Sequence, residues 1–141
     1  MRFWDTSALL SLLLAQQATE SLKEIVSADR SPVLWWGTQV EAVSAVSRLH
    51  RSGQLEETVV ASVLREIKDL TAAAFEVQPT EEVRAAACRL LRVHNLRAAD
   101  ALQLAAALVW TEHSPRGASF VCLDRGLCQA ADREGFEVLP T

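Results

Sequence analysis

The chain has 141 residues, half of them hydrophobic, so it can bury a core without disulfide or metal cross-links. Its net charge of -4 argues against a protein that coats nucleic acid through a broadly basic surface. No apolar run is long enough to cross a membrane and no signal-peptide pattern opens the chain. We therefore expect one domain over residues 1–141, in the cytoplasm and without membrane contact.

Short strands and helices alternate along the chain. Runs of aromatic and β-branched residues predict the strands, and apolar residues three or four positions apart predict the helices. The expected strands are 2–4, 33–36, 75–77, 119–123 and 136–139. The expected helices are 6–14, 19–28, 38–51, 55–70, 79–93, 96–108 and 125–133. This order predicts an α/β three-layer sandwich with a five-stranded parallel sheet flanked by helices.

Acidic residues follow three of the expected strands. Asp5 and Asp124 come at or just after strand ends, and Glu41 lies early in the next helix. In an open parallel sheet, chemistry gathers beyond the carboxyl ends of the strands, which favours a shared site. Each residue also has an ordinary explanation, because Asp is a good helix N-cap and Thr38 with Glu41 has the spacing of a capping box.

A fourth carboxylate, Asp100, interrupts the apolar stretch LRAADALQLAAAL, residues 96–108. An ion pair with Arg97 is the simplest way to compensate its charge. If the four acids converge, one arginine is too little, since two unit charges about 4 Å apart repel by roughly 4 kcal/mol at an effective dielectric of about 20. Oxygen ligands without His or Cys suit Mg²⁺, with Mn²⁺ as the other candidate.

The three cysteines, Cys88, Cys122 and Cys128, form no CxxC motif, and the three histidines form no zinc pattern. We expect reduced, mostly buried thiols. Of the adjacent Trp35 and Trp36, alternation along a strand predicts that at least one packs in the core, although either could stack on a nucleobase.

The four acidic segments together resemble the PIN-domain nucleases, and among them the small VapC-type toxins of toxin–antitoxin pairs. The resemblance spans residues 2–139 and is carried by FWDTSALL, TQVEAVSAV, LRAADALQLAAAL and FVCLDRGLCQAADREGFEVL. It implies a magnesium-dependent endoribonuclease that uses a metal-activated water and leaves a 5′-phosphate and a 3′-hydroxyl. It also implies a homodimer and a small cognate antitoxin that covers the site.

The resemblance assigns the catalytic and metal-binding roles residue by residue. The acids that it implies for both roles are Asp5, Glu41, Asp100 and Asp124. Auxiliary positions are Thr6, Ser7, Arg97 and Gln103. Cys122 departs from the family pattern, which often has Ser or Thr two residues before the last Asp.

Basic and apolar helix surfaces supply candidate contacts with partners. Arginines that could border an RNA cleft are Arg48, Arg51, Arg92 and Arg97. The amphipathic helices at 8–14, 19–28 and 55–70 could pack against an antitoxin as well as against the core.

Two other functional classes stay open at this point. A PIN-like domain could act as a non-catalytic binding module. A magnesium-binding signalling domain of the receiver type fits less well, because it needs a lysine near the last strands and the only lysines are Lys23 and Lys68.

Overall fold

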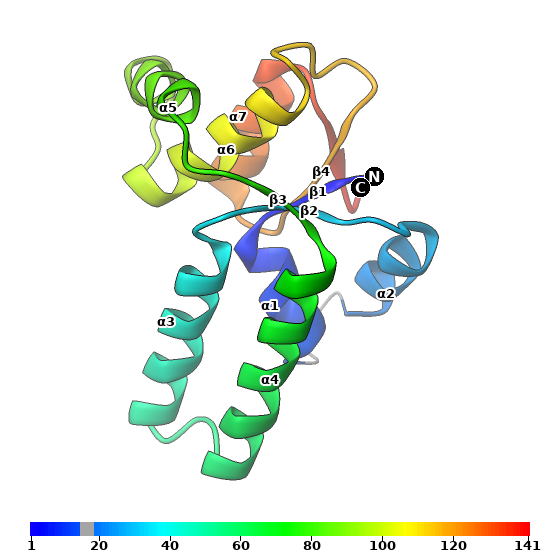
Figure 1. The fold of residues 1–141 in the computed structure, drawn as a ribbon, viewed down its shortest axis with the longest axis vertical. Coiled ribbons are helices and arrows are strands. Elements are labelled where there is room, and N and C mark those ends of the chain that lie inside the picture. The colour runs from blue at the N-terminus through cyan, green and yellow to red at the C-terminus, as the bar shows by residue number, and fades with distance from the viewer. Residues whose placement is uncertain (15–18) are drawn as a thin grey trace.

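A five-stranded parallel sheet forms the centre of the structure, a computed structural model that describes residues 1–14 and 19–141 (Figure 1). The strand order is β3-β2-β1-β4-β5, and every neighbouring pair is parallel. The strands are β1 (Phe3–Trp4), β2 (Val33–Trp35), β3 (Phe75–Val77), β4 (Ser119–Val121) and β5 (Glu137–Leu139). The predicted fold class is confirmed.

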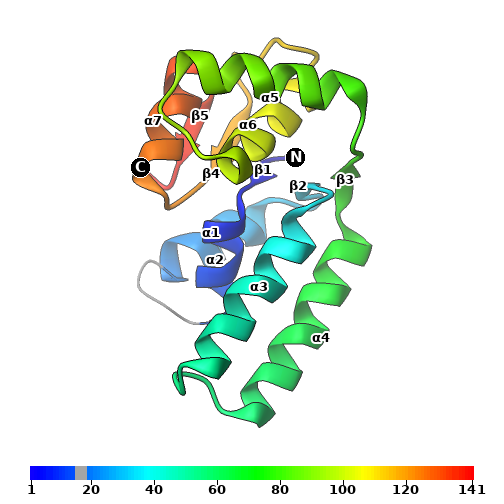
Figure 2. The same ribbon diagram turned by 90° about the vertical axis from the view of Figure 1, so that its left-hand side faces the viewer.

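Helices cover both faces of this sheet (Figures 1 and 2). On one face lie α5 (Glu81–Val93), α6 (Ala98–Trp110) and α7 (Arg125–Glu134). On the other lie α1 (Thr6–Leu13), α2 (Thr19–Ala28), α3 (Thr38–Arg51) and α4 (Glu57–Ala73). None of the helices in these described ranges is long and apolar enough to cross a membrane.

Successive residues of each strand pack into the two cores alternately, because side chains along a strand point to opposite faces of the sheet. Phe3 of β1 stacks on Phe120 of β4 with 5.2 Å between ring centroids, in the core beneath α5, α6 and α7. The next residues, Trp4 and Val121, face the opposite way and pack with α1 and α2. Both cores are therefore anchored in the two central strands, whose carboxyl ends lead directly to Asp5 and Asp124.

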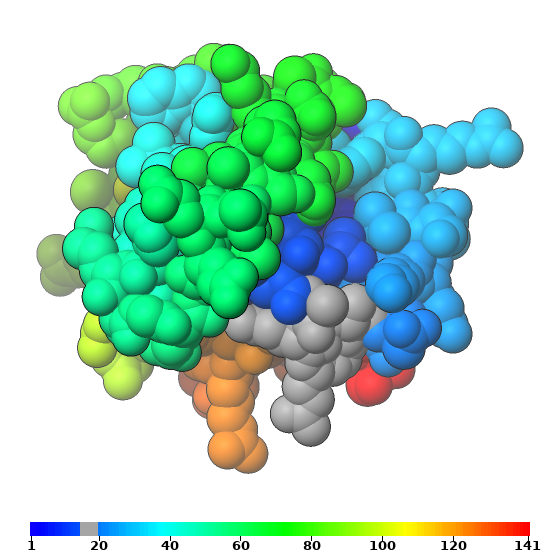
Figure 3. Space-filling model, turned by 90° about the horizontal axis from the view of Figure 1, so that it is seen from below, coloured from blue at the N-terminus to red at the C-terminus, as the bar shows by residue number. Residues whose placement is uncertain are grey.

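The antiparallel helices α3 and α4 project away from the sheet as a hairpin (Figure 2). A separate apolar cluster that includes Val46, Val63 and Ile67 joins them. Seen from below, α1 is visible between α4 and α2 (Figure 3). Leu10 of α1 packs against the hairpin cluster while Leu12 packs with α2, so α1 connects the hairpin to the rest of the molecule.

Several element ends differ from the predictions. Helix α4 covers Glu57–Ala73 instead of 55–70, because its buried face continues through Thr71. Strand β2 ends at Trp35, which is buried, and Trp36 beyond it is half exposed, as expected for one of the pair. Strand β4 ends at Val121, where the chain turns Cys122 toward Asp5.

The expectation of mostly buried thiols holds in part. Cys122 is buried and Cys128 is half-buried, but Cys88 is exposed on α5, and all three are free. Cys88 is exposed because it follows Ala87 at the edge of the buried face of α5 and its side chain points away from the core.

We predict that Leu104→Ala, which empties a fully buried position on α6, lowers the free energy of unfolding by about 2–5 kcal/mol. Urea titration followed by circular dichroism measures this loss. The matched control is Leu91→Ala on the exposed side of α5, where we expect a change of about 0.5 kcal/mol or less. Equal unfolding midpoints for the two variants would contradict the packing described here.

Candidate functional site

Four carboxylates lie at the carboxyl edge of the sheet, each delivered by a different element. Asp5 follows β1 directly, Asp124 follows β4 after two residues, and Glu41 and Asp100 lie in the first turns of α3 and α6. Repulsion from Asp5 and Asp100 reaches Glu41, and repulsion from Asp124 and Asp5 reaches Asp100. The four groups therefore share one electrostatic environment, which we call the acid site.

Asp5 is almost fully buried, with 4% of its surface exposed. Its Oδ2 accepts from the Ser7 backbone N–H at 3.1 Å, the Ser7 hydroxyl at 2.6 Å and the Cys122 thiol at 3.5 Å. Burial raises the pKa of Asp5 despite these donors. The capping interpretation is correct, because Asp5 is the N-cap of α1, and the same bonds hold the carboxylate at the edge of the sheet.

Asp124 caps α7 in the same way, since its Oδ1 accepts from the Leu127 N–H at 2.9 Å. Unlike Asp5, this residue is exposed. The helix N-terminus also favours negative charge at this place. Both aspartates that follow the central strands therefore combine a capping bond with a position in the acid site.

The capping-box interpretation of Glu41 is wrong. The N-cap of α3 is Gly37, which makes no side-chain cap, and Glu41 points instead to Gln103 of α6 and Thr6 of α1. The Gln103 amide nitrogen lies 2.7 Å from Glu41 Oε2 and 2.7 and 3.0 Å from the hydroxyls of Thr6 and Thr38. Tertiary contacts with α6 and α1 replace the local capping bonds.

Gln103 therefore orients Glu41, not Asp100. Its side chain is fully buried, and its Oε1 is the one buried side-chain nitrogen or oxygen atom without a hydrogen-bond partner among residues 1–14 and 19–141. Burial raises the pKa of Glu41 to about 7, with further contributions from Asp5 and Asp100, while the bond from Gln103 acts in the opposite direction.

The ion pair with Arg97, the simplest explanation for the Asp100 charge, does not form. Arg97 is the extended N-cap residue of α6, and no ion pair joins the two within the described part of the chain. The pKa of Asp100 is raised by burial and by repulsion from Asp124 and Asp5, and the charge of Arg97 offsets this only in part. The acid site thus keeps uncompensated negative charge.

The carboxylates do not form a preassembled coordination sphere. Among the residues that the structure describes, no group of three Asp, Glu, His or Cys side chains is arranged to hold a metal ion. In Asp5 and Asp124 the capping bonds are made by one carboxylate oxygen, Oδ2 and Oδ1 respectively. The donor set itself, four carboxylates with neighbouring hydroxyls, has the chemistry of a hard-cation site.

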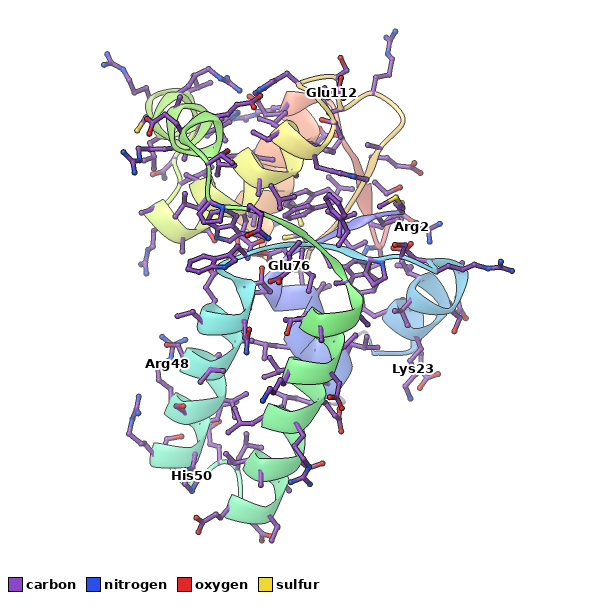
Figure 4. All side chains as sticks on the ribbon, viewed as in Figure 1. Arg2, Lys23, Arg48, His50, Glu76 and Glu112 are labelled. Atoms are coloured by element: carbon purple, nitrogen blue, oxygen red, sulfur yellow. The ribbon has the colours of Figure 1, made fainter. Side chains whose placement is uncertain are left out.

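Two hollows border the acid site. One of about 610 Å³ lies between α1 and α3 and is lined by Ser7, Leu10, Leu14, Ala45, Arg48, Leu49, Ser52, Gln54, Leu123 and Asp124. The other, of about 660 Å³, includes Arg97, Asp100 and Asp124. Arg48 extends from the side of α3 opposite α4 (Figure 4). Of the four arginines expected at a cleft, Arg48 and Arg97 line these hollows, whereas Arg51 and Arg92 do not.

Two contributors were missed as such in the sequence. The spacing of Thr38 suggests only half of a capping box, yet its buried hydroxyl faces Gln103. Cys122 departs from the family pattern, yet its thiol donates a hydrogen bond to Asp5. The only available signal was their position next to strand ends, which does not name a partner.

No family model matches the chain. It is 31% identical over 147 residues to Ribonuclease VapC45 of Mycobacterium tuberculosis (strain CDC 1551 / Oshkosh) and equally to Ribonuclease VapC49 of strain H37Rv. Each match covers 98% of this chain and 94% of the relative.

Solved structures share the fold at lower identity. FitAcB from Neisseria gonorrhoeae has a TM-score of 0.67 at 19% identity, with 99% of this chain and 97% of that chain covered. VapBC-1 from nontypeable Haemophilus influenzae has a TM-score of 0.64 at 12% identity, with 97% and 95% covered.

The sheet order and the helices on both faces define a PIN-like fold. Within that class, the sequence identity over nearly the full length is decisive. The chain belongs to the VapC ribonuclease family.

The raised pKa of Glu41 predicts a pH-dependent stability. Between its ordinary value of 4.5 and about 7, the folded protein binds more protons at Glu41 than the unfolded chain does. Stability from this group is therefore present at low pH and is lost as pH rises through about 7. Urea midpoints measured from pH 5 to pH 8 in the presence of EDTA should show the decline.

The matched variant for this test is Glu41→Gln, which keeps the size of the side chain but cannot ionise. We expect its urea midpoint to decline less than that of the wild type over the same pH range. Identical slopes for the two proteins would contradict the raised pKa.

Proposed function

We propose that this protein is a metal-dependent endoribonuclease, the toxin of a toxin–antitoxin pair, and that Asp5, Glu41, Asp100 and Asp124 hold one or two Mg²⁺ ions. The observation that carries the proposal is the gathering of four carboxylates at one edge of the sheet, where Glu41 and Asp100 are repelled by the other acids. Membership of the VapC ribonuclease family supports RNA as the substrate.

A divalent cation fits this donor set. Burial raises the pKa of Asp5, Glu41 and Asp100, and repulsion adds to the shift at Glu41 and Asp100, so the ionised forms are destabilised until positive charge arrives. The nearby cation Arg97 compensates only part of that charge. Carboxylate oxygens without imidazole favour Mg²⁺ or Mn²⁺ over softer ions.

When bound, such an ion acidifies a water and stabilises charge on the phosphodiester and the leaving oxygen. The chain's own residues supply position. Ser7 holds Asp5, and Gln103 with Thr6 holds Glu41, so two of the acids are oriented before substrate arrives. Attack by water would leave a 5′-phosphate and a 3′-hydroxyl.

Substrate contacts are proposed for the rims of the two hollows. Arg48 lines one hollow and Arg97 the other, Asp124 lines both, and each arginine could meet a phosphate of the RNA backbone. Arginines at these positions are suited to contacts with the phosphate backbone of RNA rather than to base-specific recognition. The sequence contains few basic residues, which agrees with a small number of such contacts.

A small antitoxin and a homodimer complete the proposal. One structure of similar fold, from Klebsiella pneumoniae, is described by its name as a toxin–antitoxin complex. In this chain, the hollow between α1 and α3 combines Leu10, Leu14 and Leu49 with acidic Asp124. That surface suits an amphipathic segment that carries a basic side chain.

The capping bonds make a sharp test available. Asn caps a helix about as well as Asp but brings no charge, so Asp5→Asn and Asp124→Asn should change the melting temperature little. We expect each variant to lose Mg²⁺-dependent cleavage of RNA by about 100-fold or more, because a metal ligand is lost. Cleavage is measured on a fluorescent RNA, and toxicity by growth after induction.

The control is Asp132→Asn, an exposed position on the same helix as the Asp124 cap. It should cleave RNA at the wild-type rate. Undiminished cleavage by Asp5→Asn and Asp124→Asn would refute the metal site. An equal loss of cleavage in the control would show that removal of any negative charge on α7 lowers the activity.

A further inference from the structure

A pair of thiols lies directly beneath the acid site. Cys122 is 2% exposed, and its thiol lies 3.5 Å from Asp5 Oδ2 and 3.8 Å from the Ser7 hydroxyl. The backbone N–H of Asp124 donates to its sulfur at 3.3 Å. This one sulfur atom therefore contacts both aspartates that follow the central strands.

Cys128 is the second member of the pair. It lies one helical turn into α7 and is half-buried, and its Sγ is 3.4 Å from the backbone carbonyl oxygen of Cys122. The Cys128 sulfur therefore lies against the backbone of Cys122, so closure of a disulfide depends on rotation of the two side chains.

A soft-metal site is the main competing use of two thiols. It needs further ligands at the pair, and in residues 1–14 and 19–141 no three Cys, His, Asp or Glu side chains are placed to hold an ion. Cys88, the third thiol, lies exposed on α5 and makes no pair with the other two. The position of the Cys128 sulfur beside Cys122 favours chemistry between the two thiols over a soft-metal site.

We propose that Cys122 and Cys128 are a redox-sensitive dithiol that hydrogen peroxide closes into a disulfide, and that closure switches off the acid site. The loss of nuclease activity rests on the proposed function. The formation of the disulfide does not.

The reaction needs one peroxide molecule as oxidant. The Cys128 thiolate, the more exposed of the two, attacks one peroxide oxygen, so an S–O bond forms and the O–O bond breaks, with hydroxide leaving as water. The Cys122 sulfur then attacks the resulting sulfenic acid. The S–S bond forms, the S–O bond breaks and a second water leaves, so two thiols are oxidised and one peroxide is reduced.

Closure would act on the acid site in two ways. A disulfide sulfur carries no proton, so Asp5 loses the donor that Cys122 supplies. The new ring also encloses Asp124, because this residue lies between the two cysteines in sequence and its N–H donates to Cys122. Both aspartates are therefore displaced by a single covalent change.

The test compares the purified chain before and after hydrogen peroxide, with reduction by a phosphine as the reversal. Intact mass should fall by two hydrogen atoms, and peptide mapping should find Cys122 joined to Cys128 while Cys88 still reacts with iodoacetamide. RNA cleavage should fall by about tenfold or more, the equivalent of one lost hydrogen bond to a charged group, and return on reduction. Mn²⁺ affinity, measured by calorimetry, should fall with it.

Cys128→Ala should cleave RNA at the wild-type rate and resist peroxide, and Cys128→Ser serves if the alanine variant is unstable. Cys88→Ala is the matched control and should remain sensitive. Absence of the Cys122–Cys128 peptide, or equal peroxide sensitivity in Cys128→Ala, overturns the proposal. A disulfide that changes neither cleavage nor Mn²⁺ affinity overturns the proposed switch. A reduced protein that cleaves no RNA counts against the proposed function alone. In that case the intact mass and the Mn²⁺ affinity still test the dithiol.

Discussion

Repulsion between carboxylates at one edge of the sheet is the constraint on which the rest of the structure depends. Burial raises the pKa of Asp5, Glu41 and Asp100, and neighbouring negative charge raises the pKa of Glu41 and Asp100 further. Arg97 offsets part of the shift at Asp100. Such an arrangement is costly for a fold that only has to be stable. It is explained if a cation completes the site, and the scaffold then has the task of holding the acids in place without it.

The scaffold does this with bonds that also build the fold. Asp5 begins α1 and Asp124 begins α7, so each carboxylate is fixed by the helix that it caps. Glu41 is held by a hydrogen bond from Gln103, which is remote in sequence. The position of Gln103 depends on the packing of α6 against the sheet. The core beneath α5, α6 and α7 therefore contributes to the site through one buried amide, and α1 contributes from the opposite face through Thr6.

The sequence was sufficient for the architecture and for which strand ends carry acids, because short aromatic strands and amphipathic helices are local patterns. It was insufficient where a side chain chooses between a local and a distant partner. Thr38 and Glu41 have the spacing of a capping box. Gln103, 62 positions away from Glu41, donates hydrogen bonds to both of them instead. Arg97 is close to Asp100 in sequence but does not pair with it, and the contact of Cys122 with Asp5 spans 117 positions. Residue spacing alone does not show whether a side chain bonds to a local or to a distant partner.

The central claim is that the four carboxylates share a divalent cation, and a crystal structure with Mn²⁺, located by its anomalous scattering, tests it most directly. The account predicts an anomalous peak bounded by Asp5, Glu41, Asp100 and Asp124, within about 2.0–2.6 Å of oxygens from at least two of them. A crystal saturated with Mn²⁺ that has no peak at this edge of the sheet, or has one only at the exposed acids elsewhere, would contradict it.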